Sequence, residues 1–152
     1  MKITRQGDYA LRALLALAFA TEDQKTLSIR QISETDKIPY KFLEQIMVHL
    51  KKTGFVKSTK GKYGGYSLAR PAQKITLGEV IRAVDGPLSP IGTQAEIKKR
   101  IQTEEHHPGL YCVLLDVRNA ISEILDKKTL ADVCEKSFEL AKSKTTYQMY
   151  YI

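Results

Sequence analysis

Hydrophobic residues in the first third of the chain recur at helical spacing in three segments. A run rich in Ala and Leu predicts a buried helix over residues 9–20, and Asp8 is the expected cap of that helix. A capping box that begins at Ser28 predicts a short second helix. Pro39 fits the first position of a third helix, which Gly54 would end.

Two short segments with the composition of strands follow the third helix. Residues 55–58 and 66–69 flank a loop, residues 59–65, that holds three of the nine glycines. This pattern predicts a β-hairpin with a flexible, basic tip. Three helices followed by a hairpin are the element order of a winged helix–turn–helix, in which residues 35–38 would be the turn.

The second half of the chain predicts further helices. A capping box at Thr76 begins a helix to about Val84, and a last helix is expected from Thr129 to about Ala141. Between them lies a seam of apolar residues at helical spacing: Leu110, Val113, Leu114, Val117, Ala120, Ile121, Ile124 and Leu125. Because this seam follows a complete small domain, we expect a dimerisation helix.

The fold class is therefore expected to be mostly α with a small β-hairpin wing. We predict a winged helix–turn–helix DNA-binding domain over residues 1–85 and a linker or sensor loop over 86–109, with a short helix around 95–102. Residues 110–152 are expected to form the dimerisation helix, a C-terminal helix and an aromatic tail.

Positive charge is confined to the first half of the chain. Residues 1–82 hold 15 Lys and Arg against 7 Asp and Glu, whereas residues 83–152 hold 9 against 10. No acidic residue lies between Gln45 and Gly78. A basic field in one segment is typical of a protein that binds nucleic acid, and the alternative is an ordinary solvated basic surface.

The third helix carries the side chains suited to reading bases. Gln45 can bond adenine, Lys41 can reach guanine or a phosphate, and Glu44 can accept a hydrogen bond from a cytosine amino group. The start of the second helix and the lysines of the hairpin would contact phosphates. The expected DNA-binding residues are Ser28, Tyr40, Lys41, Glu44, Gln45, Lys51, Lys60, Lys62 and Tyr63.

Other classes of protein fit the sequence poorly. No apolar run approaches the roughly 20 residues of a membrane helix, and the N-terminus lacks the pattern of a signal peptide, so we expect a cytoplasmic protein. Neither a nucleophile–base pair in a pocket nor a phosphate-binding loop before a helix is evident, and we expect no enzyme. A protein-interaction module without DNA binding remains the alternative from another class.

Six segments resemble the Rrf2 family of bacterial transcription regulators. They are residues 1–4 (MKIT), 7–12 (GDYALR), 42–46 (FLEQI), 50–56 (LKKTGFV), 60–66 (KGKYGGY) and 77–87 (LGEVIRAVDGP). The resemblance implies a homodimer built on a long C-terminal helix that binds a palindromic operator. It places Tyr40, Lys41, Glu44 and Gln45 on the recognition helix and Lys60 on the wing.

The chain departs from the cluster-bearing members of this family, which place three cysteines before and at the start of the long helix. Only Cys112 stands near that position, so we expect no iron–sulfur cluster and no metal. A mixed-ligand iron–sulfur or metal site for redox sensing, from Cys112, His106, His107 and Asp8 of a neighbouring subunit, is the alternative. Cys112 or Cys134 could instead be a redox-active thiol or a buried structural cysteine.

The clusterless pattern and the terminal residues 147–152 are most similar to the branch of cysteine-metabolism repressors. The resemblance implies control through a complex with cysteine synthase. We hypothesise that Tyr151 and Ile152 enter that enzyme, since an exposed tail with a carboxylate suits capture in a backbone pocket. The alternative is a tail that packs on the dimer.

Overall fold

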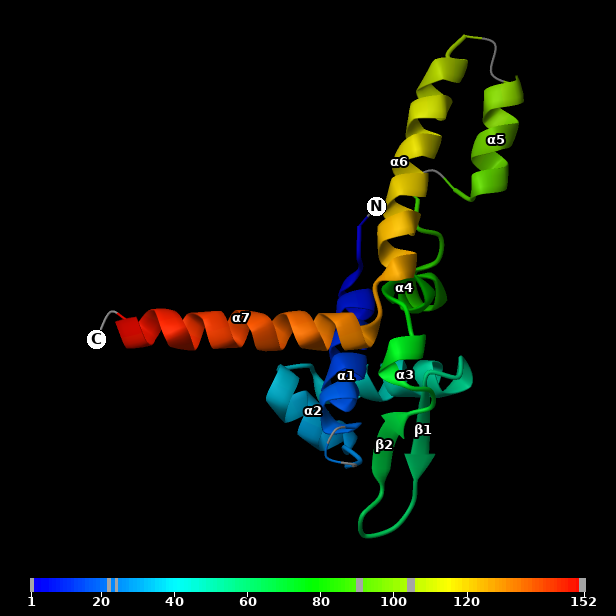
Figure 1. Ribbon diagram of the computed structural model, residues 1–152. Coiled ribbons are helices and arrows are strands. Elements are labelled where there is room, and N and C mark those ends of the chain that lie inside the picture. Colours follow the sequence, from blue (N-terminus) through cyan, green and yellow to red (C-terminus); the bar gives the residue numbers. More distant parts are fainter. Residues whose placement is uncertain (1, 22, 24, 90–91, 104–105, 151–152) are drawn as a thin grey trace.

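A computed structural model describes residues 2–21, 23, 25–89, 92–103 and 106–150, with the side chains described as far as residue 144. The elements are helices and a two-stranded antiparallel sheet (Figure 1). They are α1 (Arg5–Thr21), α2 (Ile29–Asp36), α3 (Tyr40–Lys52), β1 (Val56–Thr59), β2 (Gly65–Leu68), a 3-10 turn η1 (Ala72–Lys74), α4 (Leu77–Asp85), α5 (Gln94–Thr103), α6 (Pro108–Lys127) and α7 (Leu130–Tyr150). The predicted fold class, mostly helical with a hairpin wing, is confirmed.

The first helix begins four residues earlier than the sequence indicated. Thr4 caps α1, because its hydroxyl accepts a hydrogen bond from the Gly7 amide at 3.1 Å. Thr4 is itself fixed by the carboxylate of Asp85 at the end of α4, to which its amide donates at 3.0 Å. The prediction that Asp8 is the cap is therefore wrong. Asp8 lies inside the first turn, where its carboxylate is 3.5 Å from the Arg12 guanidinium.

The second and third helices form the predicted helix–turn–helix. Ser28 caps α2 through the expected capping box, in which the Gln31 amide donates to Ser28 Oγ at 3.1 Å and the Ser28 amide donates to Gln31 Oε1 at 2.8 Å. Lys37, at the turn, adopts the left-handed conformation with φ 56°. The third helix begins at Tyr40, so Pro39 is its cap rather than its first residue.

The hairpin wing has the predicted position, shifted by one residue in each strand. Val56 pairs with Leu68 and Thr59 with Gly65 in an antiparallel register. A third segment joins the base of this ribbon, because Leu27 and Tyr66 exchange two backbone hydrogen bonds of 2.7 and 3.0 Å. Gly65 permits this approach, since a Cβ there would lie 2.8 Å from the Leu27 carbonyl oxygen.

A single hydrophobic core joins the helix–turn–helix, the base of the wing and the start of α7. Its fully buried members include Leu14 of α1, Leu43 and Leu50 of α3, and Leu130 of α7, and Cys134 lies at its edge. The beginning of α7 therefore packs into the core of the N-terminal half, although the sequence separates the two by more than 40 residues.

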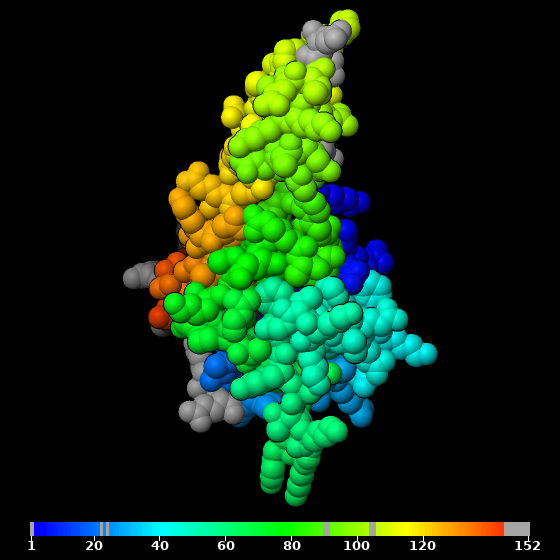
Figure 2. Space-filling model, turned by 90° about the vertical axis from the view of Figure 1, so that its right-hand side faces the viewer, coloured from blue at the N-terminus to red at the C-terminus, as the bar shows by residue number. Residues whose placement is uncertain are grey.

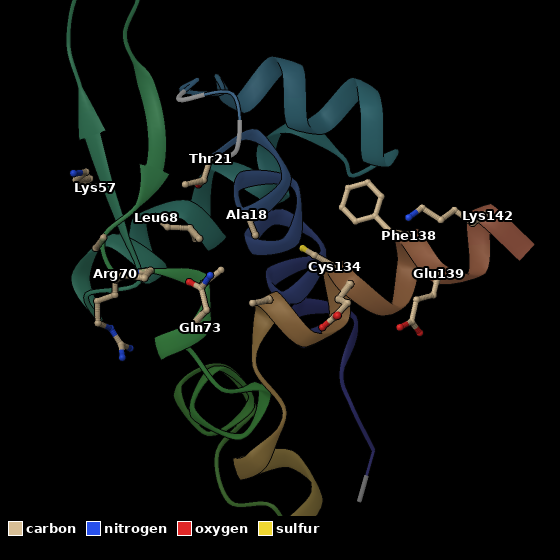
Figure 3. Close-up of a pocket in the computed structure, with 15 residues that line it drawn as sticks. Ala18, Thr21, Lys57, Leu68, Arg70, Gln73, Cys134, Phe138, Glu139 and Lys142 are labelled. Carbon is tan, nitrogen blue, oxygen red and sulfur yellow. The ribbon is translucent and has the colours of Figure 1, made fainter.

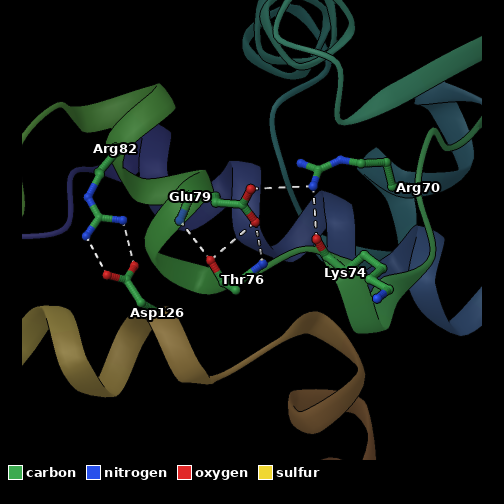
Figure 4. A network of polar contacts seen from close by, with 6 residues as sticks. All are labelled: Arg70, Lys74, Thr76, Glu79, Arg82 and Asp126. Carbon is green, nitrogen blue, oxygen red and sulfur yellow. Dashed lines mark hydrogen bonds and ion pairs between the residues drawn. The ribbon is translucent and has the colours of Figure 1, made fainter.

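A polar network fastens α4 to the end of α6 (Figure 4). The Arg82 guanidinium donates two hydrogen bonds to the Asp126 carboxylate, at 2.6 and 2.8 Å. The Leu77 amide donates to the Lys128 carbonyl at 2.8 Å, and the predicted Thr76 cap of α4 is present. The winged domain is thus held to α6 at a defined place.

The elements of the second half project from this domain (Figure 1). Helix α5 packs along α6, and it extends by one residue at each end the short helix that the sequence predicts around 95–102. Helix α7 runs to Tyr150, whereas we expected it to end near Ala141. Among the described residues, the helices are all too short or too polar to cross a lipid bilayer.

The predicted apolar seam of α6 divides into two faces. One is half-buried on the side of the helix where α4 and α5 pack, and consists of Leu114, Ile121 and Leu125. The other is exposed and consists of Leu110, Val113, Val117, Ala120 and Ile124. We call this second set the α6 stripe. Its members lie three or four residues apart, so they share one face of the helix.

Candidate nucleic-acid interface

The recognition helix α3 has one buried and one exposed face. Leu43, Ile46 and Met47 are almost fully buried. Lys41, Glu44 and Gln45 occupy the opposite face and are exposed, as is Tyr40 at the first position. The helical spacing of 41, 44 and 45 brings their side chains together at the N-terminal half of α3, the part of such a helix that meets base edges in the major groove.

The flanks of α3 also carry expected residues. Ser28 lies at the N-terminus of α2, where backbone amides favour an anion such as a phosphate. Lys51, in the last turn of α3, donates a hydrogen bond of 2.7 Å from its ammonium group to Ser58 Oγ of β1. The structure therefore places Lys51 at the junction of α3 and the wing.

The wing projects from the body of the molecule with its expected cations exposed (Figure 2). Tyr63 at the tip is 85% exposed, and the Lys62 ammonium lies 5.7 Å from the centre of its ring. The loop at the tip is tied to the segment before α2, because the Thr26 hydroxyl donates to the Tyr63 carbonyl at 2.9 Å. Lys60 and Lys62 are thus carried away from the core, in a position from which they can reach a polyanion.

Sequence reasoning missed an apolar part of this surface. Val48 lies on α3 three residues after Gln45 and is 65% exposed. It shares a cavity of about 500 Å³ with Ile29 of α2 and Tyr66 of β2, and Glu44 and Gln45 complete the lining. The signal was available in the spacing, since Val48 follows Lys41, Glu44 and Gln45 on the same helical face.

A capped helix–turn–helix, a polar recognition face and a basic hairpin beside it define the class: a winged helix–turn–helix of the kind that binds DNA. The sequence pattern of the Rrf2 family, described as an iron-dependent transcriptional regulator, matches residues 3–136. The chain belongs to the Rrf2 family of transcriptional regulators.

Individual relatives agree with this assignment. The HTH-type transcriptional regulator CymR of Bacillus subtilis is 34% identical over 133 residues, which cover 88% of this chain and 89% of that protein. The structure of CymR, described as the global cysteine regulator of B. subtilis, matches with a TM-score of 0.76 and 32% identity over 90% of this chain and 98% of that one. The structure of IscR from T. potens matches with a TM-score of 0.70 and 30% identity over 90% of this chain and 88% of that one. Both CymR and IscR are names of HTH-type transcriptional regulators.

The side chains of this chain do not form the thiolate set of an iron–sulfur site. The sequence has two cysteines, of which Cys112 is exposed on α6 and Cys134 is buried at the start of α7. In the part of the chain that the structure describes, no three His, Cys, Asp or Glu side chains are grouped to hold a metal ion. Fe–S clusters need several thiolate or imidazole ligands, and the two cysteines of this chain lie on different helices. The alternative of a mixed site from Cys112, His106, His107 and Asp8 of a neighbouring subunit is not tested by the single chain.

A cavity of about 850 Å³ lies between the end of α1, the base of the wing and the start of α7 (Figure 3). Cys134 and Phe138 form part of its wall, and Lys57, Arg70 and Glu139 supply charges of both signs. It shares no lining residue with α3, and is therefore separate from the candidate nucleic-acid interface. The predicted partner-binding residues Tyr151 and Ile152 lie outside the described residues.

Proposed function

We propose that the chain is a homodimeric repressor that binds a palindromic operator and controls genes of cysteine metabolism. The observation that carries the DNA-binding part is the exposed triplet Lys41, Glu44 and Gln45 on α3, next to a hairpin whose lysines project from the body. A fold with this arrangement inserts its recognition helix in the major groove while the wing follows the backbone.

The α6 stripe supports the homodimer. Its large members are between 47% and 63% exposed in the single chain: Leu110, Val113, Val117 and Ile124. An apolar row of this length on a projecting helix is stabilised when a second copy covers it in a two-fold arrangement. The Arg82–Asp126 ion pair would then set the separation of the two recognition helices, which must match half-sites about 34–36 Å apart.

Operator selection from random DNA duplexes, followed by binding titrations, tests this proposal. We expect an inverted repeat and an affinity that falls steeply with salt concentration, because several phosphates release counterions. Gln45→Ala should relax the preference at one position of each half-site by about 1–3 kcal/mol. Lys62→Ala should instead weaken all sequences alike and reduce the salt dependence by about one charge per subunit.

The alternative from another class, an interaction module without DNA binding, gives a different result in the same experiment. It predicts that no motif is recovered and that retention on DNA is absent or insensitive to salt. Repression is distinguished from activation by a reporter gene downstream of the selected operator, where the wild-type chain should lower transcription and Gln45→Ala should restore it.

Control of cysteine metabolism rests on the likeness to CymR, which is described as a global cysteine regulator in B. subtilis. Through the same likeness we propose cysteine synthase as a protein partner. Purified cysteine synthase from the same organism should be retained by the immobilised wild-type chain, and a chain that lacks Ile152 should lose it. Equal recovery of the enzyme by the two chains would remove the C-terminal contact from the proposal.

A further inference from the structure

Val48 is an apolar side chain in the middle of a polar, DNA-facing surface. It follows Lys41, Glu44 and Gln45 along one face of α3, and 65% of its surface is exposed. The opposite face of the same helix already supplies the core through Leu43 and Leu50. Val48 therefore contributes little to the core, and its exposed surface is available for a contact outside the chain.

The surroundings of Val48 form an open hollow with apolar walls. Ile29, at the first turn of α2, and the ring of Tyr66, on β2, line it together with Val48. Tyr66 is held in place by the two backbone hydrogen bonds to Leu27, so the far wall of the hollow is fixed. Glu44 and Gln45 border it on the side of the recognition helix. This lining suits an apolar group that stands next to groups that form hydrogen bonds.

DNA presents one group of this kind in the major groove. The C5-methyl group of thymine is the apolar feature of the base edges there, beside acceptors and donors that polar side chains read. Glu44 places one carboxylate at the border of the hollow. No acidic residue follows from Gln45 to Gly78, a stretch that includes Val48 and Tyr66 and carries seven Lys and Arg residues. An anionic duplex is thereby drawn to the same surface that holds the hollow.

We propose that Val48, Ile29 and Tyr66 form a slot for the C5-methyl group of a thymine adjacent to the base that Gln45 contacts. The proposal rests on the proposed function, since it requires that α3 enters the major groove. It adds a specificity-determining contact: the chain would select thymine by an apolar group at one position and another base by the Gln45 amide at the neighbouring position.

Replacement of thymine by uracil tests the slot, because it removes this methyl group and leaves the Watson–Crick edge unchanged. Each thymine of the selected operator is replaced in turn, in both half-sites, and binding is measured for the wild type, Val48→Ala and Val48→Thr. Loss of one methyl contact should weaken wild-type binding about fourfold per half-site and about 15-fold for both. Ile3→Ala, which removes an exposed aliphatic side chain from the N-terminal segment before α1, is the matched control.

At one position, uracil should weaken binding by the wild type and by Ile3→Ala but not by Val48→Ala. Val48→Thr keeps the shape and replaces one methyl group by a hydroxyl, so it should lose part of the discrimination and still fold. The slot is refuted if no uracil position weakens wild-type binding, or if the effect persists in Val48→Ala. It is also refuted if Val48→Ala weakens thymine and uracil duplexes equally at every position, which would indicate packing against deoxyribose. Failure to recover any operator would refute the proposed function itself.

Discussion

Val117, at the centre of the α6 stripe, offers the sharpest test of the proposed dimer. The side chain is 47% exposed in the single chain, and Leu110 and Ile124 mark the two ends of the stripe. In a two-fold interface the central residue of a stripe lies close to its own counterpart. Val117→Glu would therefore place two carboxylates near each other in an apolar contact.

The magnitude follows from the exposed surface. Full burial of a Val side chain contributes about 1.5–3 kcal/mol, so the exposed half contributes about 1 kcal/mol in each subunit. Repulsion and desolvation of the paired carboxylates add at least about 1 kcal/mol to the cost. The total of about 3 kcal/mol corresponds to a dissociation constant of the dimer raised at least about 100-fold.

Sedimentation equilibrium over a series of protein concentrations measures this change directly. Asn119→Glu is the control, because Asn119 is exposed on α6 nearly opposite Val117 and gains the same charge. We expect the control to dimerise like the wild type and Val117→Glu to sediment as a monomer that binds a single half-site weakly. An unchanged dissociation constant in Val117→Glu would show that the stripe is not the interface.

Three further substitutions test the geometry of the single chain. Hydrogen bonds from Arg82 hold the pKa of Asp126 below its usual value, so the pair stabilises the fold at neutral pH and this contribution is lost as the pH falls through the lowered pKa. Asp126→Asn should therefore cost about 0.5–1 kcal/mol in urea denaturation at neutral pH and about nothing in strong acid, and an equal cost at both would contradict the assignment. Gly65→Ala should expel the Leu27 segment from the wing at a cost of about 1–3 kcal/mol, visible as faster hydrogen exchange of the Leu27 and Tyr66 amides, which bond each other's carbonyl groups; unchanged exchange would show that a small backbone shift makes room for the Cβ. Ser28→Ala should lose about 1 kcal/mol of stability with its capping bonds, whereas Ser28→Asp should keep the cap and weaken DNA binding, and equal DNA affinity in both would remove Ser28 from the interface.

Local signals in the sequence predicted most of the N-terminal half. The capping boxes at Ser28 and Thr76 depend on side chains three residues apart, and both are present in the structure. The same holds for the exposed face of α3, where helical spacing alone places Gln45 opposite the buried residues. The apolar hollow at Val48 was not predicted, because Ile29 and Tyr66 reach it from elements distant in sequence.

Two features were beyond the sequence for one physical reason, which is that the deciding contact is not local. Asp8 has the composition of a helix cap, but the cap is Thr4 because Asp85, from the far end of α4, holds it in position. The sequence likewise could not divide the apolar seam of α6, since only the docking of α4 and α5 determines which side of that helix is covered.

The sequence by itself determined the helices, the hairpin, the recognition face and the charge that draws a polyanion, because each depends on the spacing or sum of nearby residues. The tertiary structure decided how these parts are joined. It placed Leu130 of α7 in the core of the winged domain, bound α4 to α6 through Arg82 and Asp126, and left one apolar stripe of α6 exposed. Such contacts depend on which surfaces, distant in sequence, bury each other. Helical periodicity shows which face of a helix is apolar, but it does not show which other element packs against that face.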